Sequence, residues 1–392
     1  MNSLRQLAEP RSLKKIQSFI KRRKFENTGK TNFYINQLVF TLGDSIPIPR
    51  FVGENFGNLE RDTIMVFADD FPRYNWAHSC RYLLFDADSF ELYETIKAEF
   101  PPFFLTDTDE ANFVPFLTPV TFEDEPVPKL TMPEDINSAN VYNENGYALL
   151  FSGNSDARHV NDLEFAYRVL TRTYKFNPDH IIVLNYDGTV NYRMGTSVKW
   201  PGDATSFIMK VNGPGDFTHL QSAFKKLSAD LTNNPNGFLF IHTSNHGGSP
   251  SAPDKFLCAF GGGIITATDF GHLIATLPAI RDTIIMMEQC HSGGFIQEVL
   301  RNSVTPNTSI SCACDANNPS MGGKNFNPFA MEWLSAVNLL SPYAKKLISD
   351  PDKNKDGKIS TREAHDFAAI YTDPGDTPIF NFKNSGDMSS LD

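Results

Sequence analysis

From residue 146 to residue 287, short apolar runs alternate with segments of helical periodicity, and this alternation limits the folds that the chain can adopt. In chain order the pattern predicts strand Tyr147–Ser152, helix Leu163–Tyr174, strand His180–Asn185, helix Phe217–Leu231, strand Gly237–His242, helix Thr268–Leu277 and strand Thr283–Met287. Strands that alternate with helices form a mostly parallel sheet with helices on both faces. The sequence therefore predicts an α/β fold, with its functional site beyond the carboxyl ends of the strands.

The first 140 residues differ from this pattern and predict two further parts. Residues 1–30 predict a basic amphipathic helix, because apolar residues recur there at helical spacing among lysines and arginines. This helix either packs on the following domain with a solvated outer face, or binds a membrane surface or nucleic acid. Residues 31–140 predict a strand-rich N-terminal domain and a proline-rich linker, with strands in Phe33–Leu42, Thr63–Ala68 and Arg81–Thr95.

Composition excludes several classes of protein. The net charge of −11 argues against general nucleic-acid binding, which needs a basic surface. No stretch approaches the ~18 apolar residues of a transmembrane helix, and no signal peptide is visible. The five cysteines have no disulfide-framework spacing, which fits free thiols in a reducing, cytoplasmic compartment.

Two predicted strands are followed by reactive side chains. His246, with Gly247 after it, follows the strand Gly237–His242, and Cys290 follows the strand Thr283–Met287. If these strands are neighbours, their carboxyl ends bring the two residues together, and an adjacent imidazole makes a thiolate available as a nucleophile. Glycines beside them let a substrate backbone approach and let N–H groups point at a developing oxyanion. The pattern therefore predicts a Cys–His catalytic pair.

Three segments within residues ~146–300 resemble clan CD (caspase-like) cysteine peptidases, and most closely the legumain (C13, asparaginyl endopeptidase) family. Residues 152–159 resemble that family's first strand-end loop with its Arg-His pair, residues 245–247 its Asp-His-Gly, and residues 288–293 its Glu-Ala-Cys-Glu-Ser-Gly. The resemblance implies a caspase-like peptidase domain over residues 141–392 that cleaves a protein or peptide substrate. It implies that Cys290 is the nucleophile, that His246 is the general base, and that Gly247 and Cys290 supply the oxyanion N–H groups.

The same resemblance places Arg158 and Glu288 in the S1 pocket. A guanidinium that faces a carboxylate complements the donor and acceptor of an Asn side chain, so P1 Asn is expected, with Asp second. A pocket with only Arg would favour Asp, and one with only acid would favour Arg or Lys. Asp156 stands where legumains have Asn, and either orients His246 or alters the pocket.

Two further readings stay open at this point. Asn-rich segments at 232–236 and 315–318 are candidates for self-cleavage, because clan CD enzymes are often matured in this way. A catalytically inactive caspase-fold protein with Ca²⁺-dependent interactions is the alternative from another class. The sequence does not identify a partner for the N-terminal domain.

Residues 352–363 fit the twelve-residue EF-hand template, with Gly357 at its sixth position. Helices are expected on both sides, at Ala344–Ser349 and Ala364–Tyr371. Because there is a single loop, we expect Ca²⁺ as a structural ion, the alternative being a solvated turn; no organic cofactor is expected. The expected ligands are Asp352, Asn354, Asp356, the carbonyl of Lys358, Ser360 and Glu363.

Overall fold

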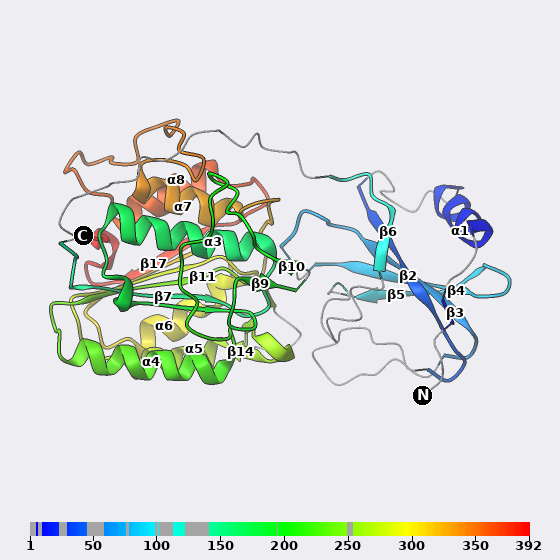
Figure 1. Cartoon of the computed structure of the whole chain (residues 1–392), viewed down its shortest axis with the longest axis horizontal. Helices are drawn as coiled ribbons and strands as arrows, with labels where there is room; N and C mark the ends of the chain where they lie inside the picture. The colour runs from blue at the N-terminus through cyan, green and yellow to red at the C-terminus, as the bar shows by residue number, and fades with distance from the viewer. Residues whose placement is uncertain are drawn as a thin grey trace. The chain divides into compact units, whose positions relative to one another are not determined.

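A computed structural model gives the fold of the chain, which divides into two compact units, Met1–Glu123 and Asp124–Asp392 (Figure 1). The predicted domain boundary near residue 140 lies outside the described residues, so it stays a prediction. The structure describes residues 5–6, 10–22, 30–44, 59–75, 78–98, 101, 113–121, 141–193, 195–248 and 254–392.

The first unit contains a six-stranded antiparallel sheet in the order β1-β2-β3-β4-β5, with β6 also paired to β2. The predicted strand Arg81–Thr95 is wrong as one element, since it is a hairpin. The chain turns at Asp86, whose carboxylate accepts the backbone N–H groups of Asp88 and Ser89. The strands are β1 Arg5–Gln6, β2 Asn32–Phe40, β3 Thr63–Asp69, β4 Cys80–Asp86, β5 Leu92–Ala98 and β6 Phe113–Leu117.

Helix α1 (Pro10–Arg22) packs its apolar side on this sheet. Ile16 and Ile20 are completely buried, and the Phe19 ring meets the Phe85 ring edge-on with centroids 5.5 Å apart. Lysines on the opposite side of the helix are exposed. The predicted amphipathic helix is thus present, and its apolar side is used within its own unit, as expected for a helix packed on the following domain.

The second unit is built on a six-stranded sheet in the order β17-β16-β15-β11-β7-β8, parallel except for β17. The four strands predicted in this unit, now β7, β8, β11 and β15, are confirmed to within one residue at each end. The bounds are β7 Gly146–Ser152, β8 Ile181–Asn185, β11 Phe238–Thr243, β15 Asp282–Met287, β16 Asn307–Cys312 and β17 Ile379–Lys383.

Helices cover both faces of this sheet (Figure 1). One face packs against α3 (Ala157–Arg168), α7 (Pro328–Asn338) and α8 (Thr361–Tyr371), and the other packs against α4 (Phe217–Thr232), α5 (Ala267–Ile274) and α6 (Ile296–Asn302). Successive strand residues alternate between the two cores: Ala148 and Leu150 enter the first, Leu149 and Phe151 the second. The expected α/β class is therefore confirmed.

The expected helix at Ala344–Ser349 is wrong. Ala344 has a positive φ of 54° and donates its N–H to the carbonyl of Ser341, and Leu340 forms an isolated bridge with Lys346. The segment is therefore a series of turns. The helix expected after the EF-hand-like loop is present as α8, so only the second of the two flanking helices exists.

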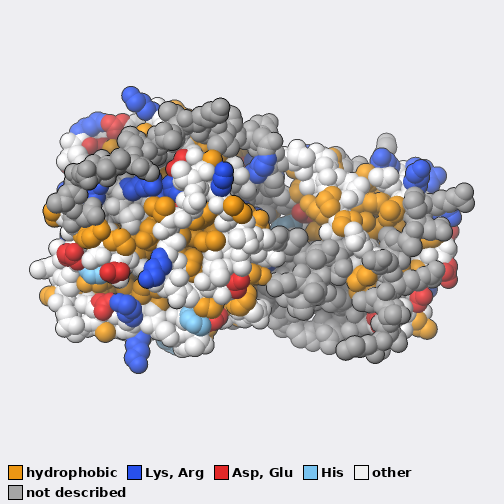
Figure 2. All heavy atoms as spheres, in the orientation of Figure 1, with side chains coloured by type: hydrophobic (Ala, Val, Ile, Leu, Met, Phe, Trp, Pro, Cys, Tyr) orange, Lys and Arg blue, Asp and Glu red, His pale blue; other side chains and the backbone are white. Residues whose placement is uncertain are grey.

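Two surface features concern membrane-spanning length and surface charge. Among the described residues, no helix has the length and apolarity needed to cross a bilayer. On the face of the second unit that Figure 2 shows, basic side chains lie scattered among uncharged atoms and form no continuous stripe.

Candidate active site

The loops that carry His246 and Cys290 leave the sheet side by side. β11 and β15 are adjacent parallel strands in which Thr243 pairs with Met287. The backbone N–H of Glu288 then donates to the Thr243 carbonyl at 2.9 Å. Gly247 lies so close to the turn that carries Cys290 that a Cβ atom at Gly247 would be 2.7 Å from the Cys290 carbonyl oxygen. The glycine after His246 is therefore required by the close approach of the two loops.

Both reactive side chains are buried. Cys290 is 0% exposed and His246 is 1% exposed, and the hydroxyl of Ser320 lies 3.9 Å from the Cys290 Sγ. Burial lowers the pKa of His246 to about 4, against the opposing effect of the Asp156 carboxylate. The imidazole is therefore neutral near pH 7, the state in which it can accept a proton.

Asp156 lies next to the imidazole and joins it to two arginines. Its Oδ2 is 3.1 Å from the His246 Nε2 and 2.7 Å from the Arg158 Nη1, and its Oδ1 contacts the Arg193 Nη2. Burial opposes ionisation of this carboxyl, but Arg193, Arg158 and His246 outweigh burial and hold its pKa well below the usual range. Asp156 is therefore an ionised group placed to orient the His246 ring.

The first turn of α3 places a second histidine against His246. Asp156 is the residue before α3, and its backbone N–H donates to the Nδ1 of His159 at 2.9 Å. Because Nδ1 accepts this bond, the His159 ring is neutral, and its burial lowers its pKa well below the usual range. The two imidazoles meet edge to face, with centroids 4.6 Å apart and planes at 85°.

Arg193 belongs to the site, although the sequence gives no signal for it. It lies in the hairpin of β9 (Asn191–Tyr192) and β10 (Gly195–Thr196), and its side chain is 5% exposed. Its backbone N–H donates to the Ser155 carbonyl at 3.0 Å, which ties the hairpin to the loop before α3. A single arginine in a hairpin carries no motif, so only the fold could reveal its place beside Asp156.

Arg158 and Glu288 both contact the first turn of α7. The Arg158 Nε donates to the Asn327 Oδ1 at 3.1 Å, and the backbone N–H of Ala330 donates to the Glu288 Oε2 at 2.7 Å. Neither contact joins the two side chains, so the expected facing pair stays a prediction. Glu288 is fully buried, and burial together with nearby carboxyl groups raises its pKa well above the usual range.

Asp156, His159 and His246 also form a potential metal-ligand group, since one ligand atom from each lies within 4.8 Å of the others. Two guanidinium groups bind the same carboxylate, and their positive charge opposes a divalent cation there. The group therefore fits an ion-pair network around His246 better than a metal centre.

The EF-hand-like loop at residues 352–363 makes the sharp turn at Gly357 that its sequence predicts. Gly357 has a φ of +87°, and its N–H donates to the Asp352 Oδ2 at 3.0 Å. The Glu363 Oε1 accepts N–H groups from Lys353 and Asn354. In the described part of the chain, the carboxylates of Asp352, Asp356 and Glu363 do not form a group within 4.8 Å. The candidate ligands are hard oxygen atoms, which suit Ca²⁺. The carboxylates of Asp352, Asp356 and Glu363 would have to move closer together to coordinate the ion.

Comparisons with known proteins give only distant similarities. No protein-family model matches the chain, and no curated protein matches it in sequence. Protein GSU0716 from Geobacter sulfurreducens is similar with a TM-score of 0.38 and 15% identity, over 62% of this chain and 97% of that one. A secreted C11 cysteine protease from Bacteroides thetaiotaomicron, solved with an irreversible peptide inhibitor, is similar with a TM-score of 0.29 and 11% identity. That match spans 50% of this chain and about half, 54%, of the protease. Similarities this low establish neither the fold family nor the activity.

Proposed function

We propose that this chain is a cysteine endopeptidase in which Cys290 is the nucleophile and His246 is the general base. The observation that carries the proposal is the meeting of the two loops at adjacent parallel strand ends, with Gly247 packed against Cys290. Asp156 beside the imidazole adds an orienting group of the kind that such pairs use.

In the proposed reaction, the Cys290 thiol gives its proton to His246 and the sulfur attacks the carbonyl carbon of the scissile bond. Asp156 contacts Nε2, so Nδ1 is the ring nitrogen that takes the proton. The tetrahedral intermediate collapses to a thioester as His246 returns the proton to the leaving amine. Water, deprotonated by His246, then hydrolyses the thioester, and the thiol regains its proton. Backbone N–H groups of Gly247 and Cys290 are proposed to hold the oxyanion, as the resemblance implies.

The proposed P1 preference is Asn, with Asp second, and two features support it. Asp156 offsets part of the charge of Arg158, although it shares its carboxylate with Arg193, and the raised pKa of Glu288 favours its uncharged form, which can both donate and accept a hydrogen bond. The pocket is therefore polar, and its positive charge is partly offset. Such a pocket suits an uncharged amide better than the carboxylate of Asp or the cation of Arg or Lys, because a charge without a partner is costly to bury.

A P1-scanning peptide library should show cleavage after Asn at least about tenfold faster than after Asp near pH 7, and faster still than after Lys. The library is assayed with the full chain, and intact mass is recorded in the same samples to detect self-cleavage. Segments 232–236 and 315–318 both include exposed residues and are the proposed self-cleavage sites. A preference for Arg or Lys would show that Glu288 acts as an ionised pocket acid. Absence of cleavage by folded protein would favour the inactive, interaction-module alternative.

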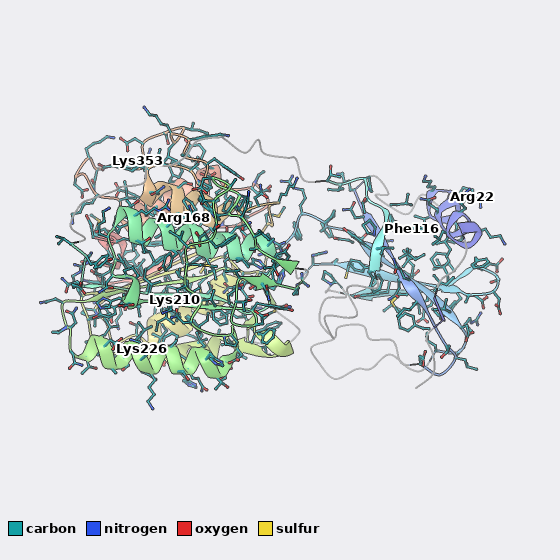
Figure 3. All side chains as sticks on the ribbon, in the orientation of Figure 1. Arg22, Phe116, Arg168, Lys210, Lys226 and Lys353 are labelled. Carbon is teal, nitrogen blue, oxygen red and sulfur yellow. The ribbon has the colours of Figure 1, made fainter. Side chains whose placement is uncertain are left out.

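We also propose that residues 352–363 bind a structural Ca²⁺ ion, and that binding stabilises α8. Free Ca²⁺ at 100 times its Kd adds about 2.7 kcal/mol, which corresponds to a Tm increase of about 5–10 °C for a domain of this size. Glu363→Gln should remove most of the Ca²⁺-dependent shift. Lys353→Gln, at an exposed loop position (Figure 3), is the matched control and should keep the shift. Equal shifts in both variants, or none in the unmodified chain, would count against a calcium site.

A further inference from the structure

The loop after β16 folds over the turn that carries Cys290. We call residues 314–321 the cover loop. Within it, the Cys314 carbonyl accepts the N–H of Gly293 at 2.9 Å, and the Asn318 carbonyl accepts the N–H of His291 at 3.1 Å. Ser320, which is 0% exposed, brings its hydroxyl to 3.9 Å from the Cys290 Sγ. The cover loop is therefore part of what encloses the thiol.

A single buried carboxyl, that of Asp376, anchors the end of the cover loop. Its Oδ1 accepts the N–H of Met321 at 2.7 Å, and its Oδ2 accepts the hydroxyl of Thr372, the residue directly after α8, at 2.5 Å. The Gly375 backbone lies close to the Met321 side chain, so a Cβ atom at Gly375 would be only 2.6 Å from the Met321 Sδ. The anchor thus links the end of α8 to the residue next to Ser320.

The charge of this anchor changes near neutral pH. Burial raises the pKa of Asp376 to about 7, helped by Asp373 and opposed by the bonds from Thr372 and Met321. Among the described residues, the other titratable groups that face it are Glu288, directly after β15, and Cys314, two residues after β16. Burial raises the pKa of both well above the usual values, which favours their neutral forms. Since an ionised acceptor binds an N–H more strongly than a neutral one, the hold on Met321 weakens as Asp376 is protonated.

We infer that Asp376 is a positioning residue for Cys290, because its carboxylate holds the cover loop against the thiol through Met321 and Ser320. Weakening this anchor loosens the loop and admits reagents to the sulfur. The role of Cys290 as the nucleophile rests on the proposed function, whereas the anchor and its effect on thiol access do not.

The test measures the rate at which iodoacetamide alkylates Cys290 in the full chain, read by peptide mass spectrometry at about pH 6 and about pH 8. Asp376→Asn keeps an oxygen for the Met321 N–H but carries no charge, so it imitates the protonated acid. Alkylation in D376N should be about fivefold faster than in the unmodified chain at pH 8, and about equal to it at pH 6. Asp376→Ala removes the anchor and should give at least about tenfold faster alkylation at both pH values.

Three controls separate this role from other effects. Hydrogen exchange of the peptide that contains Met321 should speed up in parallel, which a purely electrostatic effect on the thiol would not cause. Asp373→Asn removes a neighbouring charge and should leave alkylation nearly unchanged. Cys312, buried in β16, should stay unreacted in every folded variant. If D376A unfolds, the comparison of D376N with the unmodified chain decides the role of Asp376.

A ratio of D376N to unmodified rates that is the same at both pH values would overturn the inference. Unchanged alkylation and exchange in folded D376A would do so as well. If the unmodified chain cleaves no peptide, the proposed peptidase function fails, while the alkylation and exchange profiles still decide the role of Asp376.

Discussion

Cys290→Ala is expected to lower peptide hydrolysis by at least about 10⁴-fold, because without the sulfur no thioester can form. His246→Ala should cause a loss of similar size, since the two residues act as one unit and their effects do not add. The measurement is hydrolysis of the best library peptide, together with intact mass after treatment with a peptidyl electrophile that carries P1 Asn. The unmodified chain should gain one adduct, and C290A none.

The chain offers matched controls for this experiment. Cys258 and Cys314 are buried thiols near Cys290, and burial raises the pKa of both. Cys258→Ala and Cys314→Ala should each keep the adduct and most of the activity. Hydrolysis that survives in C290A, or an adduct on another cysteine, would show that the reaction does not pass through Cys290.

Asp156→Ala should cause the largest loss of stability among single changes at the site. Arg158 and Arg193 would then keep their positive charges without the carboxylate that both now contact, and the Arg193 side chain is only 5% exposed. Removing one partner of a buried charge pair costs about 3–5 kcal/mol, or on the order of 10 °C in Tm for a domain of this size. Thermal and denaturant unfolding of the variant measure this loss directly.

The stability that Asp156 supplies should depend on pH in a defined direction. Its pKa in the folded chain is lower than its value of about 3.9 in the unfolded chain. Its contribution is therefore fully present above about pH 4 and is lost as the pH falls below that value. The stability difference between the unmodified chain and D156A should shrink in acid, and a difference that grows there would contradict the assignment.

A double variant separates the charge effect from any other role of Asp156 at the start of α3. If the unpaired arginines cause the instability, Arg193→Ala added to D156A should restore part of the stability, with a coupling energy of about 1–3 kcal/mol. Asp187→Ala, at a more exposed turn carboxylate that bonds to neighbouring turn residues, is the control and should cost about 1 kcal/mol or less. Strictly additive losses would show that the unpaired charge of Arg193 does not cause the instability.

The strands that could be predicted from the sequence are those whose burial on both faces gives them a continuous apolar composition. Phe238-Leu239-Phe240-Ile241 is a continuous apolar run because β11 is covered on both faces, and the same holds for β15. β16 gave no such signal, since Asn307-Thr308-Ser309-Ile310-Ser311 is mostly polar although it lies inside the sheet. Its Ser311 hydroxyl bonds to the Nδ1 of His365 on α8, a partner more than fifty residues away that no local pattern reveals.

The residues around the candidate site also differ in how far the sequence could predict their positions. That the loops of Cys290 and His246 lie side by side could be predicted, because each follows a recognisable strand by three residues and contains glycine. Arg193 and Asp376 could not, because each reaches its place through a hairpin or a loop whose path the tertiary fold decides. The sequence indicated Asp156, but not its contacts with two arginines. One of these, Arg193, lies in the β9–β10 hairpin, which only the tertiary fold brings to Asp156.

The order of the strands has a consequence for how such a site can change. β7 and β11 are neighbours in the sheet, and the connection after β7 leads to α3 on one face while the connection after β11 leads to α5 on the other. At such a switch point the neighbouring loops diverge and leave a crevice at the sheet edge. Asp156 follows β7 and His246 follows β11, and their side chains meet at this point. Because the two connections touch there, a change of length in one moves the residue that the other contacts, while the strands beneath keep their register. For the proposed peptidase, substrate selectivity would therefore change through matched changes in both connections, without refolding of the sheet.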